Sequence, residues 1–284
     1  MAWLRRNALM IYAGLAVAYM LVPIVVIAVF SFGETPRDRL NFTLDGGFTL
    51  EYWKNAFSDP ELNDALLVSL ELAALTTAIA TAIGTLMAIA LVRHKFFGRR
   101  ATNLLIVLPM ATPEIVIGAA LLSMFLIYGI PLGFTTLFIA HVMFLISFVV
   151  VVVCSRLIGF DRSLEEAARD LGANAFDTFR LVTLPLLMPG IIGAALLAFA
   201  LSIDDFVISN FNSGDTVTFP LFIFGASQRG IPVEVYSIAT ILFVGVVAAM
   251  LFTVWQQRRA ERMAAVRPEE VEPLVGAVKP PVAT

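Results

Sequence analysis

Long apolar segments separated by short polar ones run along most of the chain. A helix that crosses a bilayer needs about 20 mostly apolar residues. Segments of that kind lie at 7–33, 65–92, 101–128, 115–155, 181–203 and 235–257, and all are free of formal charge except for one acid each in the second and third, Glu71 and Glu114. The 115–155 segment is too long for one span, and the turn-favouring sequence Gly-Ile-Pro-Leu-Gly at 129–133 divides it. The pattern predicts six transmembrane helices.

Composition supports a lipid environment, because the chain is 59% hydrophobic and only 14% charged. Structures that span lipid must bond their own backbone, so they are helices or closed barrels, and the apolar segments lack the alternation of barrel strands. We expect an all-α membrane protein with one transmembrane domain over 1–258 and a disordered tail over 259–284. The first segment is too long for a signal-peptide core of about 7–15 residues, so it is predicted to be a retained span. The lone Cys154 excludes a disulfide within the chain.

Basic residues predict the orientation. Of the 19 Lys and Arg residues, all but four lie in one set of connecting segments, and the four on the other side are Arg37, Arg39, Lys54 and Arg229. The side richer in Lys and Arg is cytoplasmic in membrane proteins. Both termini and the polar segment at 161–185 are therefore expected inside, and the segments 34–64 and 204–234 outside.

The polar segment 161–185 contains a short amphipathic helix. Apolar residues at spacings of three, four and seven form one helical stripe: Leu164, Ala167, Ala168 and Leu171. Asp161 or Ser163 is expected to cap its start, with Glu166 completing a capping box, and Gly172 to end it. A second short helix is expected near 174–181. From the physics alone, the apolar stripe could lie on the membrane surface or on a protein partner.

The spacing within this segment resembles the E-A-A loop of ATP-binding-cassette (ABC) importer permeases. That pattern is E-A-A, three residues, G, nine residues, I, one residue, L-P. The chain matches it at Glu166, Ala167, Ala168, Gly172, Leu184 and Pro185, with Val182 in place of the usual Ile. The resemblance implies the type I importer permease fold (MetI-like) with six transmembrane helices. It also implies that these residues couple the chain to an ATPase.

Acids in and near the spans form a second group of candidates, because ionisable groups at membrane depth are costly and usually functional. Glu114 follows Pro113 inside the third span, and Asp204 and Asp205 stand at the outer end of the fifth. We expect these three to line a substrate pathway, and the absence of a basic residue inside the spans favours a cationic substrate. For Glu71 and His141, bonding to a neighbouring helix or to the interface is the favoured interpretation.

Further matches narrow the resemblance within the importer family. The sequences Pro-Glu-Ile-Val at 113–116, Leu-Ser-Ile-Asp-Asp at 201–205 and Pro-Val-Glu at 232–234 look like the second permease subunit of spermidine/putrescine importers. That resemblance implies a partner ATPase dimer, a second homologous permease, an extracytoplasmic polyamine-binding protein and a place in the bacterial cytoplasmic membrane. It implies no nucleic acid partner. Glu114 stands where Asp is common and Gly33 where Asn is expected, which leaves a related amine open as the substrate.

The chain is expected to bind no ATP or metal itself, because it has no G-x-x-x-x-G-K-[ST] sequence to hold phosphates. ATP and magnesium would be held by the partner ATPase, and no catalytic residue is predicted in this chain. One alternative is a self-sufficient cation channel or carrier, which would need acids but no docking loop. Another is an intramembrane enzyme, which the spacing of the polar residues does not support. The apolar sequence at 219–224 predicts a short surface or re-entrant helix in the 212–234 segment.

Overall fold

The computed structural model describes residues 2–32, 47–159, 161–228, 232 and 234–266, and the described residues form helices joined by short connections. They belong to two compact units, one built from residues 1–56 and 232–284 and the other from 57–231. Residues 267–284 of the predicted tail and Gly33 lie outside the described residues.

The first unit contains α1 (Ala2–Phe30), α2 (Glu51–Lys54) and α12 (Glu234–Val266). The α1 and α12 helices are the predicted first and last spans, and they pack against each other. The Phe32 ring stacks on Trp53 of α2, with the ring centroids 5.0 Å apart. The α12 helix continues to Val266 and therefore extends into the segment that the sequence analysis assigned to a disordered tail.

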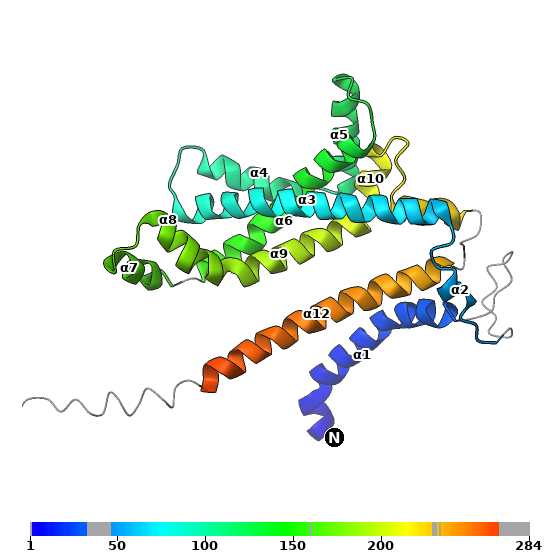
Figure 1. Ribbon diagram of the computed structural model, residues 1–284, viewed down its shortest axis with the longest axis horizontal. Helices are drawn as coiled ribbons and strands as arrows, with labels where there is room; N and C mark the ends of the chain where they lie inside the picture. The colour runs from blue at the N-terminus through cyan, green and yellow to red at the C-terminus, as the bar shows by residue number, and fades with distance from the viewer. Residues whose placement is uncertain (1, 33–46, 160, 229–231, 233, 267–284) are drawn as a thin grey trace, which may run out of the picture. The chain divides into compact units, whose positions relative to one another are not determined.

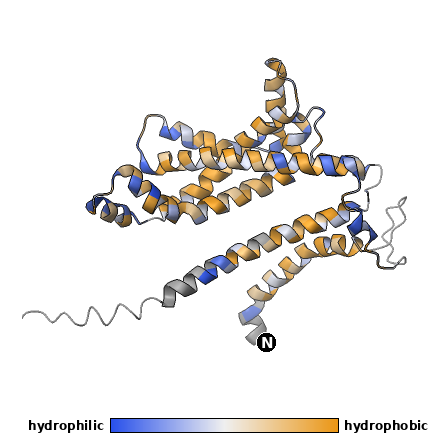
Figure 2. Cartoon of the chain, in the orientation of Figure 1, coloured by the Kyte–Doolittle hydropathy of each residue, from blue (hydrophilic) through white to orange (hydrophobic). Residues whose placement is uncertain are grey.

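The second unit is built around three long helices, α3 (Pro60–Arg93), α6 (Phe134–Ile158) and α9 (Leu184–Asp204), which pack against one another (Figure 1). Apolar residues run along all three, and polar residues gather at the connections (Figure 2). Small residues permit the close packing: a Cβ on Gly84 of α3 would lie 2.6 Å from Val149 Cγ1 of α6. Leu145, Val149 and Val153 of α6 are fully buried in this core.

The third predicted span is broken. It consists of α4 (Arg99–Ala111) and α5 (Glu114–Ile127), whose axes differ in direction by 111°. The described helices therefore provide five candidate spans, or six if this bent pair counts as one. Pro113 explains the position of the break, because a proline has no N–H and disfavours helical geometry in the residue before it. Thr112 is accordingly extended, with φ −90° and ψ 134°.

Five short helices complete the described part of the second unit. Between α6 and α9 lie α7 (Ser163–Asp170), α8 (Ala175–Thr178) and a five-residue π-helix, η2 (Phe179–Thr183). After α9 come α10 (Val207–Asn212), which packs on α5 and α6, and α11 (Phe219–Ser227). The predicted turn at 129–133 separates α5 from α6, and α11 confirms the short apolar helix expected at 219–224.

Candidate functional site: the E-A-A loop and the acids of the spans

The α7 helix carries the predicted amphipathic stripe, and the side chains of that stripe are not buried against the rest of the described chain. Among the described residues of α7 none is buried; Leu164 is 47% exposed, and Leu171, just after the helix, is 90% exposed. Glu166 and Ala167 are exposed as well. Large apolar side chains are also exposed in the segment that follows, at Phe176 and Leu181. The loop thus presents a set of apolar side chains that no described part of the chain covers.

Gly172 ends α7 as predicted. Its φ is +91°, a left-handed conformation that glycine adopts without the cost a side chain brings. The Gly172 N–H donates to the Arg169 carbonyl at 2.9 Å, and the Ala173 N–H donates to the Ala168 carbonyl at 3.0 Å. These two bonds form a Schellman motif, which satisfies the last carbonyls of the helix. The glycine therefore sets the direction in which the chain leaves α7.

The predicted capping box at the start of α7 is wrong. Arg162 occupies the cap position with helical dihedrals, so Ser163 already lies in the first turn and its hydroxyl is not placed as a cap. The Asp161 side chain instead accepts the Ser163 N–H at 2.9 Å. That backbone hydrogen bond holds the pKa of the exposed Asp161 carboxyl below its usual value.

The second helix of the loop also differs from the prediction, because α8 ends at Thr178 and continues as the π-helix η2. Leu184 and Pro185 follow as the first residues of α9. The helix runs on from η2 into α9 without a break, because Thr183 and Leu184 both have helical dihedrals. Pro185 has no N–H to bond the preceding turn, so it and Leu184 lie where the helix passes out of a π turn, a geometry often found at functional sites.

The structure separates the two neighbouring acids of the fifth span. Asp204 is the last residue of α9 and is exposed, whereas Asp205 is 8% exposed. The Asp205 carboxylate accepts the Ile208 N–H at 3.2 Å, the Ser209 N–H at 2.8 Å and the Ser209 hydroxyl at 2.9 Å. Asp205 thus holds the first turn of α10, and only Asp204 of this pair presents an open carboxylate.

His141 of α6 joins the helices around Asp205. Its Nδ1 lies 2.9 Å from the Ser202 hydroxyl of α9, and its Nε2 lies 3.1 Å from the Ser209 hydroxyl of α10. Ser202 is in turn 3.1 Å from the Thr76 hydroxyl of α3. His141 is 2% exposed, and the expectation that it bonds across helices is confirmed. Four helices therefore meet in one buried polar cluster, made of Thr76, His141, Ser202, Asp205 and Ser209.

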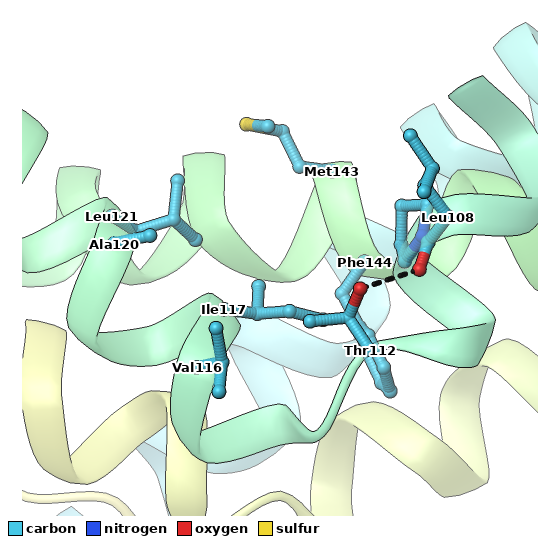
Figure 3. Close-up of a pocket in the computed structure, with 9 residues that line it drawn as sticks. Leu108, Thr112, Val116, Ile117, Ala120, Leu121, Met143 and Phe144 are labelled. Atoms are coloured by element: carbon cyan, nitrogen blue, oxygen red, sulfur yellow. Dashed lines mark hydrogen bonds between the residues drawn. The ribbon is translucent and has the colours of Figure 1, made fainter.

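Glu114 lies at the break of the third span, as the first residue of α5, and is exposed. A cavity of about 260 Å³ lies beside the break, between α4, α5 and α6 (Figure 3). Its walls are mostly apolar, and the Thr112 hydroxyl on its rim donates to the Leu108 carbonyl at 2.7 Å. The residues that line it are Leu108, Pro109, Thr112, Val116, Ile117, Ala120, Leu121, Met143 and Phe144. Glu114, Asp204 and Asp205 do not line this cavity, so it does not gather the predicted pathway acids.

The sequence matches a known protein family over more than half of its length. The family described as the inner membrane component of binding-protein-dependent transport systems matches residues 80–263. Spermidine/putrescine transport system permease protein PotC of Haemophilus influenzae is 38% identical over 84% of this chain and 91% of its own length. The chain belongs to this permease family.

Other relatives and structures agree with that assignment. Putrescine transport system permease protein PotI of Escherichia coli is 34% identical over 87% of this permease and 90% of its own length. A bacterial ABC transporter that imports alginate has the same fold, with a TM-score of 0.64 at 16% identity over 90% of this permease and 97% of the other chain. The permease therefore has the type I ABC-importer fold that the E-A-A loop implied.

The sequence identified the loop motif, the acids and His141, but not the hydrogen bonds that join residues of different helices. The serines and the threonine around His141 carried no signal of their own, because hydroxyl residues in membrane helices usually serve ordinary helix packing. Ser209 and Asn212 of α10 had no role in the sequence analysis; the Asn212 side chain donates to the Gly118 carbonyl of α5 at 3.3 Å, and the Asn212 carbonyl accepts the Thr136 hydroxyl at 2.7 Å. The single buried histidine within an apolar span was the one available indication of this cluster.

We expect His141→Phe to destabilise the purified permease, because Ser202 and Ser209 would each lose a buried partner. The expected cost is about 1–3 kcal/mol in the free energy of unfolding, since bonds between membrane helices are individually weak. Thermal unfolding in detergent measures it. His94→Phe is the matched control, because His94 is exposed at the end of α3. Equal melting temperatures for the two variants would contradict a stabilising role for the cluster.

Proposed function

We propose that the permease forms half of the pore of an ATP-driven importer that takes up polyamines such as spermidine and putrescine. The family assignment supports the transport role, and the names of the relatives support the substrate class. The observation that carries the proposal is the open apolar stripe of α7, within the segment that matches the E-A-A pattern and ends at Gly172. An uncovered apolar helix face between two spans fits a docking surface for another subunit.

The proposed occupant of that surface is an ATPase on a separate chain. Glu166, Ala167 and Ala168 would lie in its cleft, while Gly172 fixes how the helix ends and Leu184 and Pro185 begin the span that it moves. The ATPase supplies ATP and magnesium and performs the hydrolysis. A second homologous permease completes the pore, and a binding protein delivers the substrate, as in a solved alginate transporter that was crystallised with its periplasmic protein.

The open acids suit a substrate that carries ammonium groups. Glu114 and Asp204 are exposed in the chain, one at the break of the third span and one at the end of the fifth. Separate carboxylates provide successive weak counter-charges, which permit release as well as entry. Asp205 would act on the pathway through α10, which its carboxylate holds, in addition to the direct role expected from the sequence.

The proposed orientation places α7 and both termini in the cytoplasm. The bias of Lys and Arg toward that set of connections supports it. Asp204 then stands on the outer half of the membrane, where a binding protein would deliver its substrate. ATP binding would draw the two ATPases together, move the two docking helices, and open the pore toward the outside.

Reconstitution into liposomes tests the proposal. The permease is purified together with a second permease and an ATPase from the same organism, and labelled spermidine is supplied on a binding protein. We expect uptake that requires ATP, and ATP hydrolysis that a spermidine-loaded binding protein stimulates but a sugar-loaded one does not. Spermidine flux through the permease alone, without an ATPase, would instead indicate a channel or carrier.

A further inference from the structure

A side-chain clamp ties α7 to the ends of two membrane helices. The Arg93 guanidinium, in the last turn of α3, donates to both carboxylate oxygens of Glu165 in α7, at 2.6 Å and 2.8 Å. The Thr183 hydroxyl, just before α9, donates to the same carboxylate at 2.6 Å. One carboxylate thus accepts three donors from two different directions. Glu165 lies beside the E-A-A residues and was not among the residues the sequence singled out.

The geometry is stronger than that of an ordinary surface ion pair. Paired parallel bonds between a guanidinium and a carboxylate fix both distance and direction. The Arg93 and Glu165 side chains are only 14% and 12% exposed, and Thr183 is 5% exposed. Partial burial reduces screening by water, and removing one partner leaves the other charge poorly solvated. The clamp is therefore a fixed contact in this structure.

The clamp matters because α7 has little else to hold it. The helix has eight residues, none of them buried, and helices of that length are marginal without packing. The most extensive contacts of α7 with other described helices are with α8 and η2, the same short connection that ends in Thr183. The Schellman bonds at Gly172 act within the loop and do not attach it to α3. Through Glu165, however, α7 is bonded directly to α3, the longest of the described helices, and to the turn that precedes α9.

We propose that Arg93, Glu165 and Thr183 are positioning residues that transmit the movement of α7 to α3 and α9. This inference rests on the proposed docking of an ATPase on α7. A push on a short helix moves the membrane helices only if the helix cannot tilt or slide on its own. The clamp removes that freedom at the side of α7 that faces α3, while the apolar stripe remains open for the ATPase. Force at the stripe then reaches two packed spans together.

The test separates hydrolysis from transport. Arg93→Gln and Glu165→Gln are compared with wild type in liposomes that contain the complete transporter. We expect the ATPase to remain bound and to hydrolyse ATP within about twofold of wild type, while spermidine taken up per ATP falls at least about tenfold. The double variant should be no worse than either single variant, because both remove the same contact. Lys95→Gln is the matched control: it removes a neighbouring exposed charge outside the clamp and should leave that ratio unchanged.

Two further measurements distinguish a failure of the clamp from a failure of the proposed function. Arg93→Lys keeps the charge but not the paired bonds, so its spermidine uptake per ATP should lie between that of Arg93→Gln and that of wild type. Hydrogen exchange of the α7 amides, measured on the permease alone, should be faster in Arg93→Gln than in wild type.

Unchanged exchange in α7 would contradict the clamp even if the transporter assembles, and so would an unchanged uptake per ATP. Equal losses of uptake, hydrolysis and ATPase binding would also overturn it, since they would indicate a role in assembly. If wild type failed to bind an ATPase, the proposed function would fail, and the exchange measurement would still decide whether the clamp holds α7.

Discussion

Gly172→Val is expected to abolish most uptake while leaving the permease in the membrane. Gly172 has a φ of +91°, and a β-branched residue is a severe outlier there. The cost of a left-handed conformation is roughly 1–2 kcal/mol for an ordinary residue, which corresponds to about a tenfold shift in the population of the native loop end. The variant should therefore lose the Schellman bonds that fix the exit from α7, and uptake should fall by about tenfold or more.

Gly172→Asn is the control that separates backbone strain from bulk. Apart from its chain neighbours, no described heavy atom lies within 4 Å of a Cβ placed on Gly172, so a Cβ meets no steric barrier there. Asparagine tolerates the left-handed region, whereas valine does not. We expect Gly172→Asn to keep most of the uptake at equal amounts of protein in the membrane. Normal uptake by the valine variant would contradict the proposal that the geometry of the α7 end controls coupling between the ATPase and transport.

Asp204→Asn and Asp205→Asn should both reduce uptake, but for different reasons. Asp204 is exposed, so its amide variant loses only a charge that would oppose an ammonium group. At about 4 Å such a pair contributes roughly 1–4 kcal/mol between water and a partly buried site, enough for a tenfold loss of polyamine uptake. We expect that loss in Asp204→Asn with an unchanged melting temperature.

Asp205→Asn should lower the melting temperature as well as uptake. Its carboxylate accepts donors from Ile208 and Ser209, and an amide would direct an NH₂ group at one of them. An unmet buried donor costs about 1–3 kcal/mol, so the first turn of α10 should loosen. Uptake and thermal unfolding, measured on both variants, show whether Asp205 stabilises α10 or acts on the pathway directly. A stable Asp205→Asn protein with poor uptake would place this carboxylate on the pathway itself, and normal uptake by both variants would end the acid-pathway proposal.

The features that the sequence predicted well are local. The apolar segments identify the spans because hydrophobic length alone decides what can cross a bilayer. Gly172 was predictable because a glycine directly after an amphipathic stripe is the usual end of a helix. The same reasoning placed a turn at 129–133 and a short helix at 219–224, both of which the structure contains.

The features that it missed depend on residues far apart in the chain. Arg93 and Glu165 are 72 residues apart, and His141 and Ser202 are 61 apart. Neither pair follows from spacing, because both depend on how α3, α6 and α9 pack. Pro113 disfavours a continuous helix, but the size of the 111° turn between α4 and α5 depends on how these helices pack against α10 and α6. Asp204 and Asp205 could not be told apart from sequence, since adjacent helical residues point about 100° apart and only the packing says which one is buried.

The broken third span has a consequence for how the protein enters the membrane during synthesis. At 1.5 Å per residue, α4 and α5 are each about 20 Å long, shorter than a hydrocarbon layer of about 30 Å. Neither half can anchor itself as it leaves the ribosome. Only the two halves together approach the length of a span, and the bend between them packs against α6 and α10, which are translated later. A nascent chain that stops within α5 would therefore lack the helices against which this bend packs.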